Sequence, residues 1–197
     1  MTLGCCVPDY YSYAPLVRLD RALIVLALPG TELTAIVKML GSFSGVVPVL
    51  TDRSLSHELG YLPDKLTAEG RHDERWSLER RLLQRALGEG YPVVAFSSYS
   101  AVHADALPWL AKRGTTIYLR EDRDVIVNRV TEAVAQDHKR HWLLAQGEPV
   151  VPAKVNRLLD AHEAVLRRCE RTLDAPGLES HAIAYGLLDP LGLEPTS

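Results

Sequence analysis

The sequence predicts an α/β fold of three layers, in which helices cover both faces of a parallel β-sheet. Residues 22–28, ALIVLAL, are a continuous apolar run of the kind found in strands that are buried on both faces. Strand signals recur at 45–50, 91–98 and 115–119, and a helical pattern separates each strand from the next. Helical crossovers of this length join parallel strands, so the alternation indicates a single parallel sheet.

The remaining elements follow from apolar periodicity and from helix-ending residues. The expected helices span 34–40, 73–90, 104–114, 122–136 and 154–175. Gly41 is expected to end the first helix, and residues 51–70 form a broken polar stretch. Pro48 indicates that the second strand lies at an edge or ends there. A fifth strand is expected at 181–188, HAIAYGLL.

Length and composition indicate one globular domain. The chain has 197 residues, of which 47% are hydrophobic and 24% charged, so it can bury a sizeable core. Residues 1–20 are expected to be an amino-terminal extension, and residues 21–197 a single domain. Residues 137–153 lack any strand or helix pattern, which predicts a lid over a ligand.

Charge and cysteine content exclude several classes of protein. The net charge of −3 gives no reason to expect binding to nucleic acid or to an anionic membrane. Residues 1–20 contain no signal-peptide apolar block, so a cytoplasmic location is expected. The three cysteines, Cys5, Cys6 and Cys169, have no metal-binding spacing, and neither a disulfide framework nor a metal site is expected.

The octapeptide ALPGTELT, after the first strand, has the layout of a phosphate-binding turn. In the P-loop (Walker A) pattern G-x-x-x-x-G-K-[ST], backbone amides and lysine hold the phosphates and the hydroxyl holds magnesium. Ala27 and Glu32 occupy the two glycine positions, Leu33 the lysine position, and Thr34 the hydroxyl position. Gly30 remains within the turn. Because only Thr34 is retained, the turn is a degenerate P-loop.

Two of these replacements oppose phosphate binding. Glu32 directs a carboxylate at the phosphate, and unit charges about 4 Å apart repel by about 1 kcal/mol in water or about 4 kcal/mol at an effective dielectric of 20. Leu33 removes the cation, and none is left beside the carboxylate. Glu32 is instead expected to stabilise the helix start, and Thr31 to cap it. Lys38, one turn after Thr34, either reaches a phosphate from the side or is a surface residue.

The order of these pieces resembles the shikimate kinase family, small P-loop kinases of the nucleoside-monophosphate-kinase type. The similarity covers about residues 20–190. Residues 110–130 resemble the family's helix, strand and following helix, and residues 67–87 resemble the glycine-led helix that carries a substrate arginine. Residues 158–188 resemble the closing helix and strand. The resemblance implies the family's fold and, for an active member, use of ATP and magnesium.

The resemblance also implies ligand contacts after the second strand. Asp52 falls where the family has the second of two strand-end aspartates, which holds substrate hydroxyls. Leu50 replaces the first, which supports magnesium. Arg75, five residues after Gly70, falls at the arginine that grips the substrate carboxylate. From the residues alone, Asp52 could also cap a helix, and Arg75 could be an exposed helix charge.

Other positions of the resemblance are altered. Ser98, Tyr99 and Ser100 replace a three-glycine turn, and their side chains would crowd a substrate that packs against bare backbone. Arg140 loosely matches the lid arginine, and His162 stands where a substrate-binding arginine is expected. The replaced positions are those that bind nucleotide, metal and substrate in the family, whereas the apolar residues of the strands and helices are retained.

The preferred hypothesis is therefore a pseudokinase, a small-molecule-binding, regulatory or partner-binding protein without catalytic residues, metal or cofactor. An anionic or aromatic ligand would contact Asp52, Arg75, Ser98, Ser100 and Arg140. A protein partner or a homo-oligomer is also expected.

Two alternatives remain open. A shikimate-like kinase with a rebuilt phosphate loop would use Thr34 for magnesium, and Lys38 or a lid cation for the phosphates of ATP. A structural partner subunit with an empty cleft would need no ligand. Binding of magnesium-ATP separates the kinase from the other two.

Overall fold

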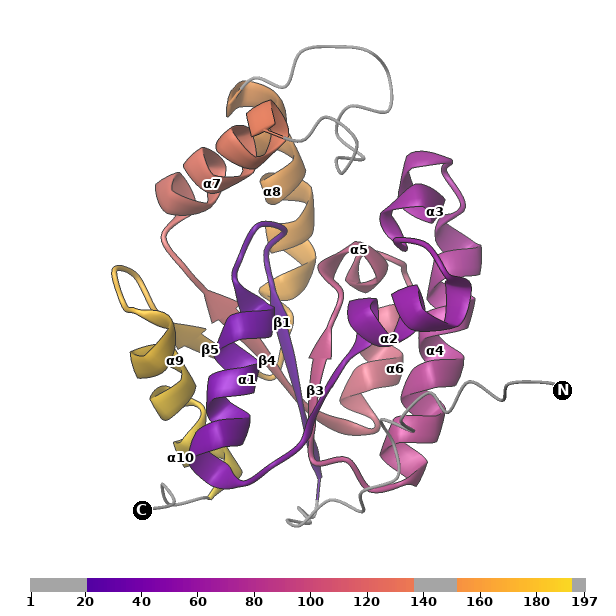
Figure 1. Ribbon diagram of the computed structural model, residues 1–197, viewed down its shortest axis with the longest axis vertical. Helices are drawn as coiled ribbons and strands as arrows, with labels where there is room; N and C mark the ends of the chain where they lie inside the picture. Colours follow the sequence, from indigo (N-terminus) through magenta and orange to yellow (C-terminus); the bar gives the residue numbers. More distant parts are fainter. Residues whose placement is uncertain (1–20, 137–151, 193–197) are drawn as a thin grey trace, which may run out of the picture.

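The computed structural model describes residues 21–136 and 152–192 and contains a parallel β-sheet with helices on both faces (Figure 1). The strands are β1 (Ala22–Ala27), β2 (Pro48–Leu50), β3 (Val93–Phe96), β4 (Gly114–Arg120) and β5 (Arg171–Asp174). Their order is β2-β3-β1-β4-β5, and every neighbouring pair is parallel. The predicted fold class is confirmed, and Pro48 begins an edge strand as predicted.

Ten helices connect and cover these strands in the described part of the chain. They are α1 (Leu33–Ser44), α2 (Thr51–Leu59), α3 (Asp64–Ala68), α4 (His72–Gly88), α5 (Ser98–Ala101), α6 (Ala106–Ala111), α7 (Arg123–Gln136), α8 (Pro152–Leu166), α9 (Ser180–Gly186) and α10 (Leu188–Leu191). The predicted helices at 34–40, 73–90, 104–114 and 122–136 are therefore confirmed within a few residues.

The alternation of side chains along β1 creates two hydrophobic cores. Ile24 and Leu26 point to one face of the sheet, where they pack with residues of α2, α4, α5, α6, α7 and α8. Leu23 and Val25 point to the other face and pack with residues of α1, α9 and α10. Each of these four side chains is buried, which explains why β1 reads as an unbroken apolar run.

The carboxyl-terminal part of the chain differs from the prediction. The helix expected at 154–175 ends at Leu166, and β5 follows it. β5 lies at the sheet edge with mostly exposed side chains, so it lacks the apolar run of a buried strand. Residues 181–188, expected as a strand, lie in α9 and the start of α10, because their buried positions have helical spacing. These positions are Ile183, Ala184, Leu187 and Leu188.

The end of α1 also differs from the prediction. Gly41 lies inside the helix, which continues to Ser44 and ends at Gly45 with a φ of 69°. A Cβ atom on Gly41 would lie 2.7 Å from the carbonyl oxygen of Val46. Glycine is needed there because the chain passes close to the helix as it turns toward β2.

The stretch at residues 51–70, predicted to be irregular, contains the two short helices α2 and α3. Each helix buries one leucine completely, Leu55 in α2 and Leu66 in α3. The prediction failed because a helix of one or two turns needs only one apolar anchor, too few to create a visible periodicity.

The carboxyl ends of β1, β2 and β3 meet at one edge of the sheet, where open α/β sheets bind ligands. Helices α7 and α8 lie side by side next to this edge (Figure 1). Most of the predicted lid, including Arg140, and the predicted extension at 1–20 lie outside the described residues. Within the described ranges, no helix is both long enough and apolar enough to cross a membrane.

Candidate functional site

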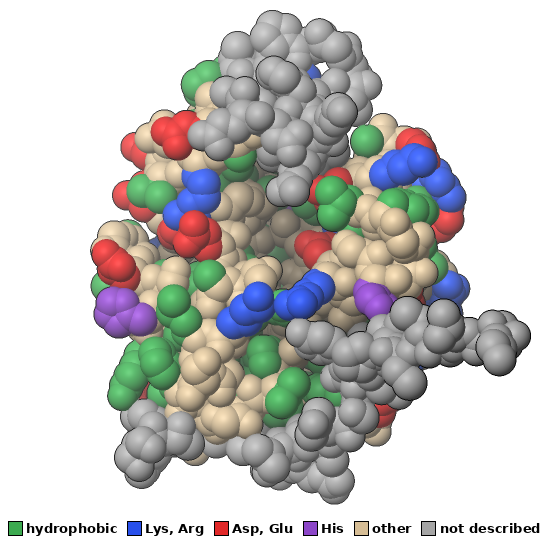
Figure 2. Space-filling view, in the orientation of Figure 1, with side chains coloured by type: hydrophobic (Ala, Val, Ile, Leu, Met, Phe, Trp, Pro, Cys, Tyr) green, Lys and Arg blue, Asp and Glu red, His purple; other side chains and the backbone are tan. Residues whose placement is uncertain are grey.

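A cavity of about 150 Å³ lies at the carboxyl ends of β1, β2 and β3. Its wall is formed by the turn after β1 and by the first turns of α1, α2 and α5. The polar side chains on the wall are Thr31, Thr34, Thr51, Asp52, Arg53, Ser97, Ser98 and Tyr99. The space-filling view shows this face hollowed between the α7 side and the α2–α3 side, with acidic and basic side chains along the rim (Figure 2).

The turn after β1 is fastened to α7. Gly30 adopts a φ of 94°, and a Cβ atom there would lie 2.4 Å from Cγ2 of Val130. Nη1 of Arg129 donates a hydrogen bond of 2.8 Å to the Gly30 carbonyl oxygen. Both terminal nitrogens of Arg129 also donate to the carboxylate of Glu121, at 3.2 and 2.9 Å. The conformation of the turn therefore depends on a helix that follows it by about a hundred residues.

Arg129 overturns the expectation that no cation stands beside Glu32. Its Nε lies 3.9 Å from the Glu32 carboxylate, although both side chains are partly exposed and such pairs contribute little stability. Glu32 occupies the N-cap position of α1 but makes no side-chain capping hydrogen bond. The predicted cap by Thr31 is wrong, because its buried hydroxyl has no hydrogen-bond partner among the described residues.

The contact between Gly30 and α7 predicts a coupled effect on stability. Gly30→Ala should lower the free energy of unfolding by about 1–3 kcal/mol, because the new methyl group meets Val130 at an unfavourable φ. Adding Val130→Ala should recover part of this loss, which urea unfolding of the single and double variants would measure. Strictly additive losses would show that the contact does not constrain the turn.

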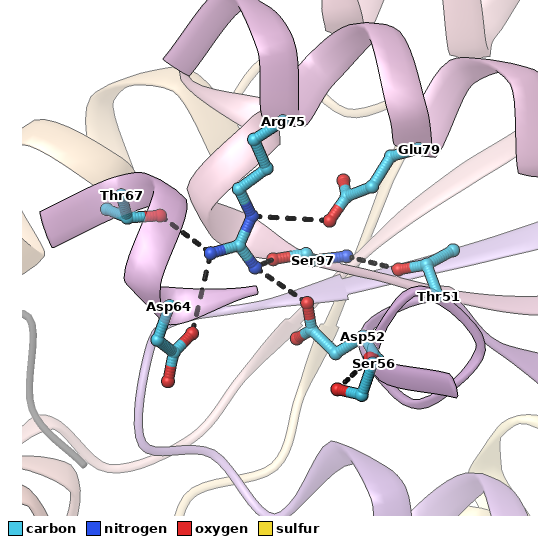
Figure 3. A network of polar contacts seen from close by, with 8 residues as sticks. All are labelled: Thr51, Asp52, Ser56, Asp64, Thr67, Arg75, Glu79 and Ser97. Carbon is cyan, nitrogen blue, oxygen red and sulfur yellow. Dashed lines mark hydrogen bonds and ion pairs between the residues drawn. The ribbon is translucent and has the colours of Figure 1, made fainter. Parts of the chain in front are cut away.

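Arg75 is the centre of a buried polar network (Figure 3). The arginine comes from α4 and is only 1% exposed. Its Nη2 donates to Asp52 at 2.6 Å and to Ser97 at 2.9 Å, and its Nη1 donates to Thr67 at 2.6 Å. Longer contacts of 3.4 Å join Nη1 to Asp64 and Nε to Glu79. The side chain is therefore not the exposed helix charge that the sequence alone allowed.

These contacts engage every hydrogen-bond donor of Arg75. A guanidinium group has five N–H donors, and each of them has a protein acceptor in this network. Burial lowers the pKa of Arg75, but the charges of Asp52, Glu79 and Asp64 outweigh burial and hold it above its ordinary value. A ligand carboxylate could bind Arg75 only by displacing one of these acceptors.

Asp52 connects the network to the cavity. It lies in the first turn of α2, makes no capping hydrogen bond, and keeps its side chain 54% exposed while it binds Arg75. Thr51 supports the same wall, since its hydroxyl accepts a hydrogen bond of 3.1 Å from the backbone N–H of Ser97. Asp52 thus remains placed to accept hydrogen bonds from a molecule in the cavity.

Glu79 is the most deeply buried carboxyl group of the network. Its side chain is fully buried, one carboxyl oxygen has no hydrogen-bond partner among the described residues, and the Ser100 hydroxyl lies beside it. Burial and, secondarily, the charge of Asp52 raise the pKa of Glu79 to about 8, although Arg75 opposes the shift. Burial therefore favours the protonated form of this carboxyl group.

Tyr99 stands between the cavity and the buried network. Its ring centroid lies 4.9 Å from Cζ of Arg75, and the ring of His162 meets it edge-on at 5.7 Å. His162 is 4% exposed and lies beside the backbone of Ser98. Burial lowers the pKa of His162 to about 4, so the imidazole is neutral at physiological pH.

The structure brings some of the predicted site residues together and separates others. Asp52, Arg75 and Ser98 lie within one connected region, whereas Ser100 lies beside Glu79 and is not among the residues that line the cavity. Lys38 is exposed on α1. Five residues of the site were not predicted from the sequence: Asp64, Thr67, Glu79, Ser97 and Arg129. Of these only Glu79 had a local signal, since it follows Arg75 by four residues on one helix face.

The turn is a poor match to the phosphates and magnesium of ATP. Leu33 supplies no charge where the P-loop pattern has lysine, and Glu32 places a carboxylate at the start of α1. Leu50, at the end of β2, offers no side-chain oxygen to a metal ion. In the described parts of the chain, no three His, Cys, Asp or Glu residues are arranged to hold a metal ion.

Several solved structures with the same architecture are kinases. No family model and no curated protein matches the sequence. Shikimate kinase from Bacteroides thetaiotaomicron is similar over 87% of this chain and 99% of its own, with a TM-score of 0.69 and 16% identity.

Two further structures extend this comparison. Shikimate kinase from Acinetobacter baumannii, solved in complex with shikimate, has a TM-score of 0.70 and 18% identity over 87% of this chain and 93% of its own. A gluconokinase from Sinorhizobium meliloti has a TM-score of 0.57 and 17% identity over 89% of this chain and 94% of its own. The protein therefore has the fold of the shikimate-kinase-like P-loop kinases.

Proposed function

We propose that this protein binds a small molecule in the cavity beside Asp52 and acts as a regulatory or partner-binding pseudokinase, without transferring phosphate. The observation that carries the proposal is the state of the turn after β1. In the P-loop pattern, a glycine and a lysine at two positions of this turn bring backbone amides and a positive charge to the phosphates. Here these positions are occupied by Glu32 and Leu33. The turn is moreover fixed in place by its contacts with α7.

The electrostatics of the turn support this proposal. A triphosphate at the turn would lie near Glu32, which does not itself line the cavity and whose only ion-pair partner in the described chain is Arg129 at 3.9 Å. Arg129 is itself held by Glu121, so two carboxylates already share its charge. Transfer of a phosphoryl group depends on cations that offset its charge, and a single arginine contributes about 10³–10⁵ in rate.

The cleft nevertheless keeps the features of a binding site. The cavity of about 150 Å³ combines the apolar side chains of Leu28, Leu33 and Phe96 with hydroxyl groups and the exposed carboxylate of Asp52. Small-molecule sites combine apolar surface with polar groups that orient the ligand, and half of the sixteen residues that line this cavity are polar. This combination favours a ligand-binding role over an empty structural cleft.

One observation favours a second candidate, a kinase with a rebuilt phosphate turn. Arg129 brings a guanidinium group to the turn, and its side chain is 31% exposed. In this reading Arg129 replaces the missing lysine from a different element, and Thr34 holds magnesium. Glu32 and Glu121 would have to release Arg129 before it could bind a phosphate.

Titration with magnesium-ATP distinguishes the two candidates. We expect no saturable heat at ATP concentrations up to the millimolar range, because residues 28–34 of the turn carry a carboxylate and no cationic side chain. Micromolar binding that weakens at least tenfold in Lys38→Ala or in Arg129→Ala would establish the kinase candidate instead. A thermal-shift screen of shikimate-like acids and uncharged analogues then tests the ligand-binding role, and no stabilisation by any of them would favour an empty cleft.

A further inference from the structure

Tyr99 separates the cavity from two buried polar side chains, Arg75 and His162, and the space that its ring fills beside them is called the inner compartment. On one side lies the cavity between the turn after β1 and the ends of β2 and β3, which Tyr99 helps to line. On the other side lie Arg75 and His162, both in contact with the tyrosine ring, at 4.9 Å and 5.7 Å. Arg75 is 1% exposed and His162 is 4% exposed, so neither is accessible from the cavity.

The inner compartment borders a polar group that makes no hydrogen bond within the described part of the fold. Nδ1 of His162 is buried and has no hydrogen-bond partner among the described residues. Buried polar groups are normally hydrogen bonded, so an unpartnered nitrogen beside a cleft points to a ligand group that could reach it. The tyrosine ring stands edge to face against this imidazole.

The backbone that carries Tyr99 is firmly held. Tyr99 belongs to the short helix α5, whose other residues, Ser98, Ser100 and Ala101, are all buried. Helix α5 also packs against α4, α6 and α8 and against β1. Because the flanking residues are fixed, the ring can clear the space between Arg75 and His162 only by changing its rotamer.

We propose that Tyr99 is the specificity-determining residue of the cleft. Its ring confines ligands to the outer cavity beside Asp52 and Thr34, and excludes planar rings from the inner compartment formed by Arg75 and His162. This inference rests on the proposed small-molecule-binding function, but it does not depend on whether ATP binds.

Binding of p-cresol, the side chain of tyrosine as a free molecule, tests this assignment. In Tyr99→Ala the inner compartment joins the cavity, and p-cresol should fill the space of the deleted ring. We expect a saturable rise of the thermal midpoint and a dissociation constant at least tenfold lower than for the wild-type protein. Tyr99→Phe, which keeps the ring, should behave like the wild type. Tyr185→Ala removes a half-exposed tyrosine from α9 and should create no p-cresol site.

Equal effects of p-cresol on the wild type, Tyr99→Ala and Tyr185→Ala would overturn the proposal. If Tyr99→Ala does not fold, Tyr99→Leu replaces it, with carbethoxylation of His162 by diethyl pyrocarbonate as the measurement. Peptide mapping should show His162 modified at least tenfold faster in Tyr99→Leu than in the wild type, and equal rates would refute the barrier. The thermal-shift screen of the wild-type protein reports separately on the proposed ligand binding, so the two failures are distinguishable.

Discussion

Replacing Arg75 with alanine should remove a large share of the stability of the fold. The substitution leaves the carboxyl groups of Asp52, Asp64 and Glu79 without the guanidinium that joins them. Removing one partner of a buried ion pair typically costs about 3–5 kcal/mol, and a domain has only about 5–15 kcal/mol in total. The thermal midpoint should therefore fall by about 10 °C or more, as circular dichroism would show.

Arg71 provides the matched control for this prediction. It lies four residues before Arg75 and binds two carboxylates, Glu69 and Glu74, but its side chain is exposed to solvent. Arg71→Ala should leave the thermal midpoint nearly unchanged, because water replaces the lost contacts. Arg75→Lys keeps the charge but loses the planar fork of donors, so its thermal midpoint should lie between those of Arg75→Ala and Arg71→Ala. A midpoint for Arg75→Ala equal to that of Arg71→Ala would show that the network does not stabilise the fold.

The contrast between these two arginines shows what sequence reasoning could reach. Both residues look alike along the chain, as charged positions at the start of one amphipathic helix. The resemblance to shikimate kinases singled out Arg75 and Asp52, and the structure joins them by a 2.6 Å bond. Their remaining partners, Asp64, Thr67 and Ser97, come from other elements, and no local pattern could have connected them to Arg75.

The fold was more accessible to prediction than the site for a physical reason. β1 and the long helix α4 carry strong apolar patterns because their burial is extensive. β5 has a mostly exposed edge and therefore no such pattern, which is why it was assigned to a helix. The cation beside Glu32 was missed because Arg129 reaches the turn from a position almost one hundred residues away.

The buried position of Glu79 predicts that the protein is less stable in mildly alkaline solution than in mildly acidic solution. The folded state retains the proton of Glu79 up to a pKa of about 8, whereas the unfolded chain releases it near 4.5. Between these values the folded state binds more protons, so the free energy of unfolding falls as pH rises. Because each pKa unit corresponds to about 1.4 kcal/mol, the full loss is roughly 5 kcal/mol at most.

Glu79→Gln isolates this effect from every other titrating group. Glutamine stays uncharged, has nearly the same shape, and can still accept a hydrogen bond from Nε of Arg75. Urea unfolding from pH 7 to pH 9, above the pKa of His162 in both the folded and the unfolded state, should therefore show a much flatter pH dependence for Glu79→Gln than for the wild type. Glu74→Gln, which removes an exposed carboxylate from the same helix, should keep the wild-type slope. Parallel curves for all three proteins would mean that Glu79 is already ionised in the folded state and that Arg75 neutralises its charge.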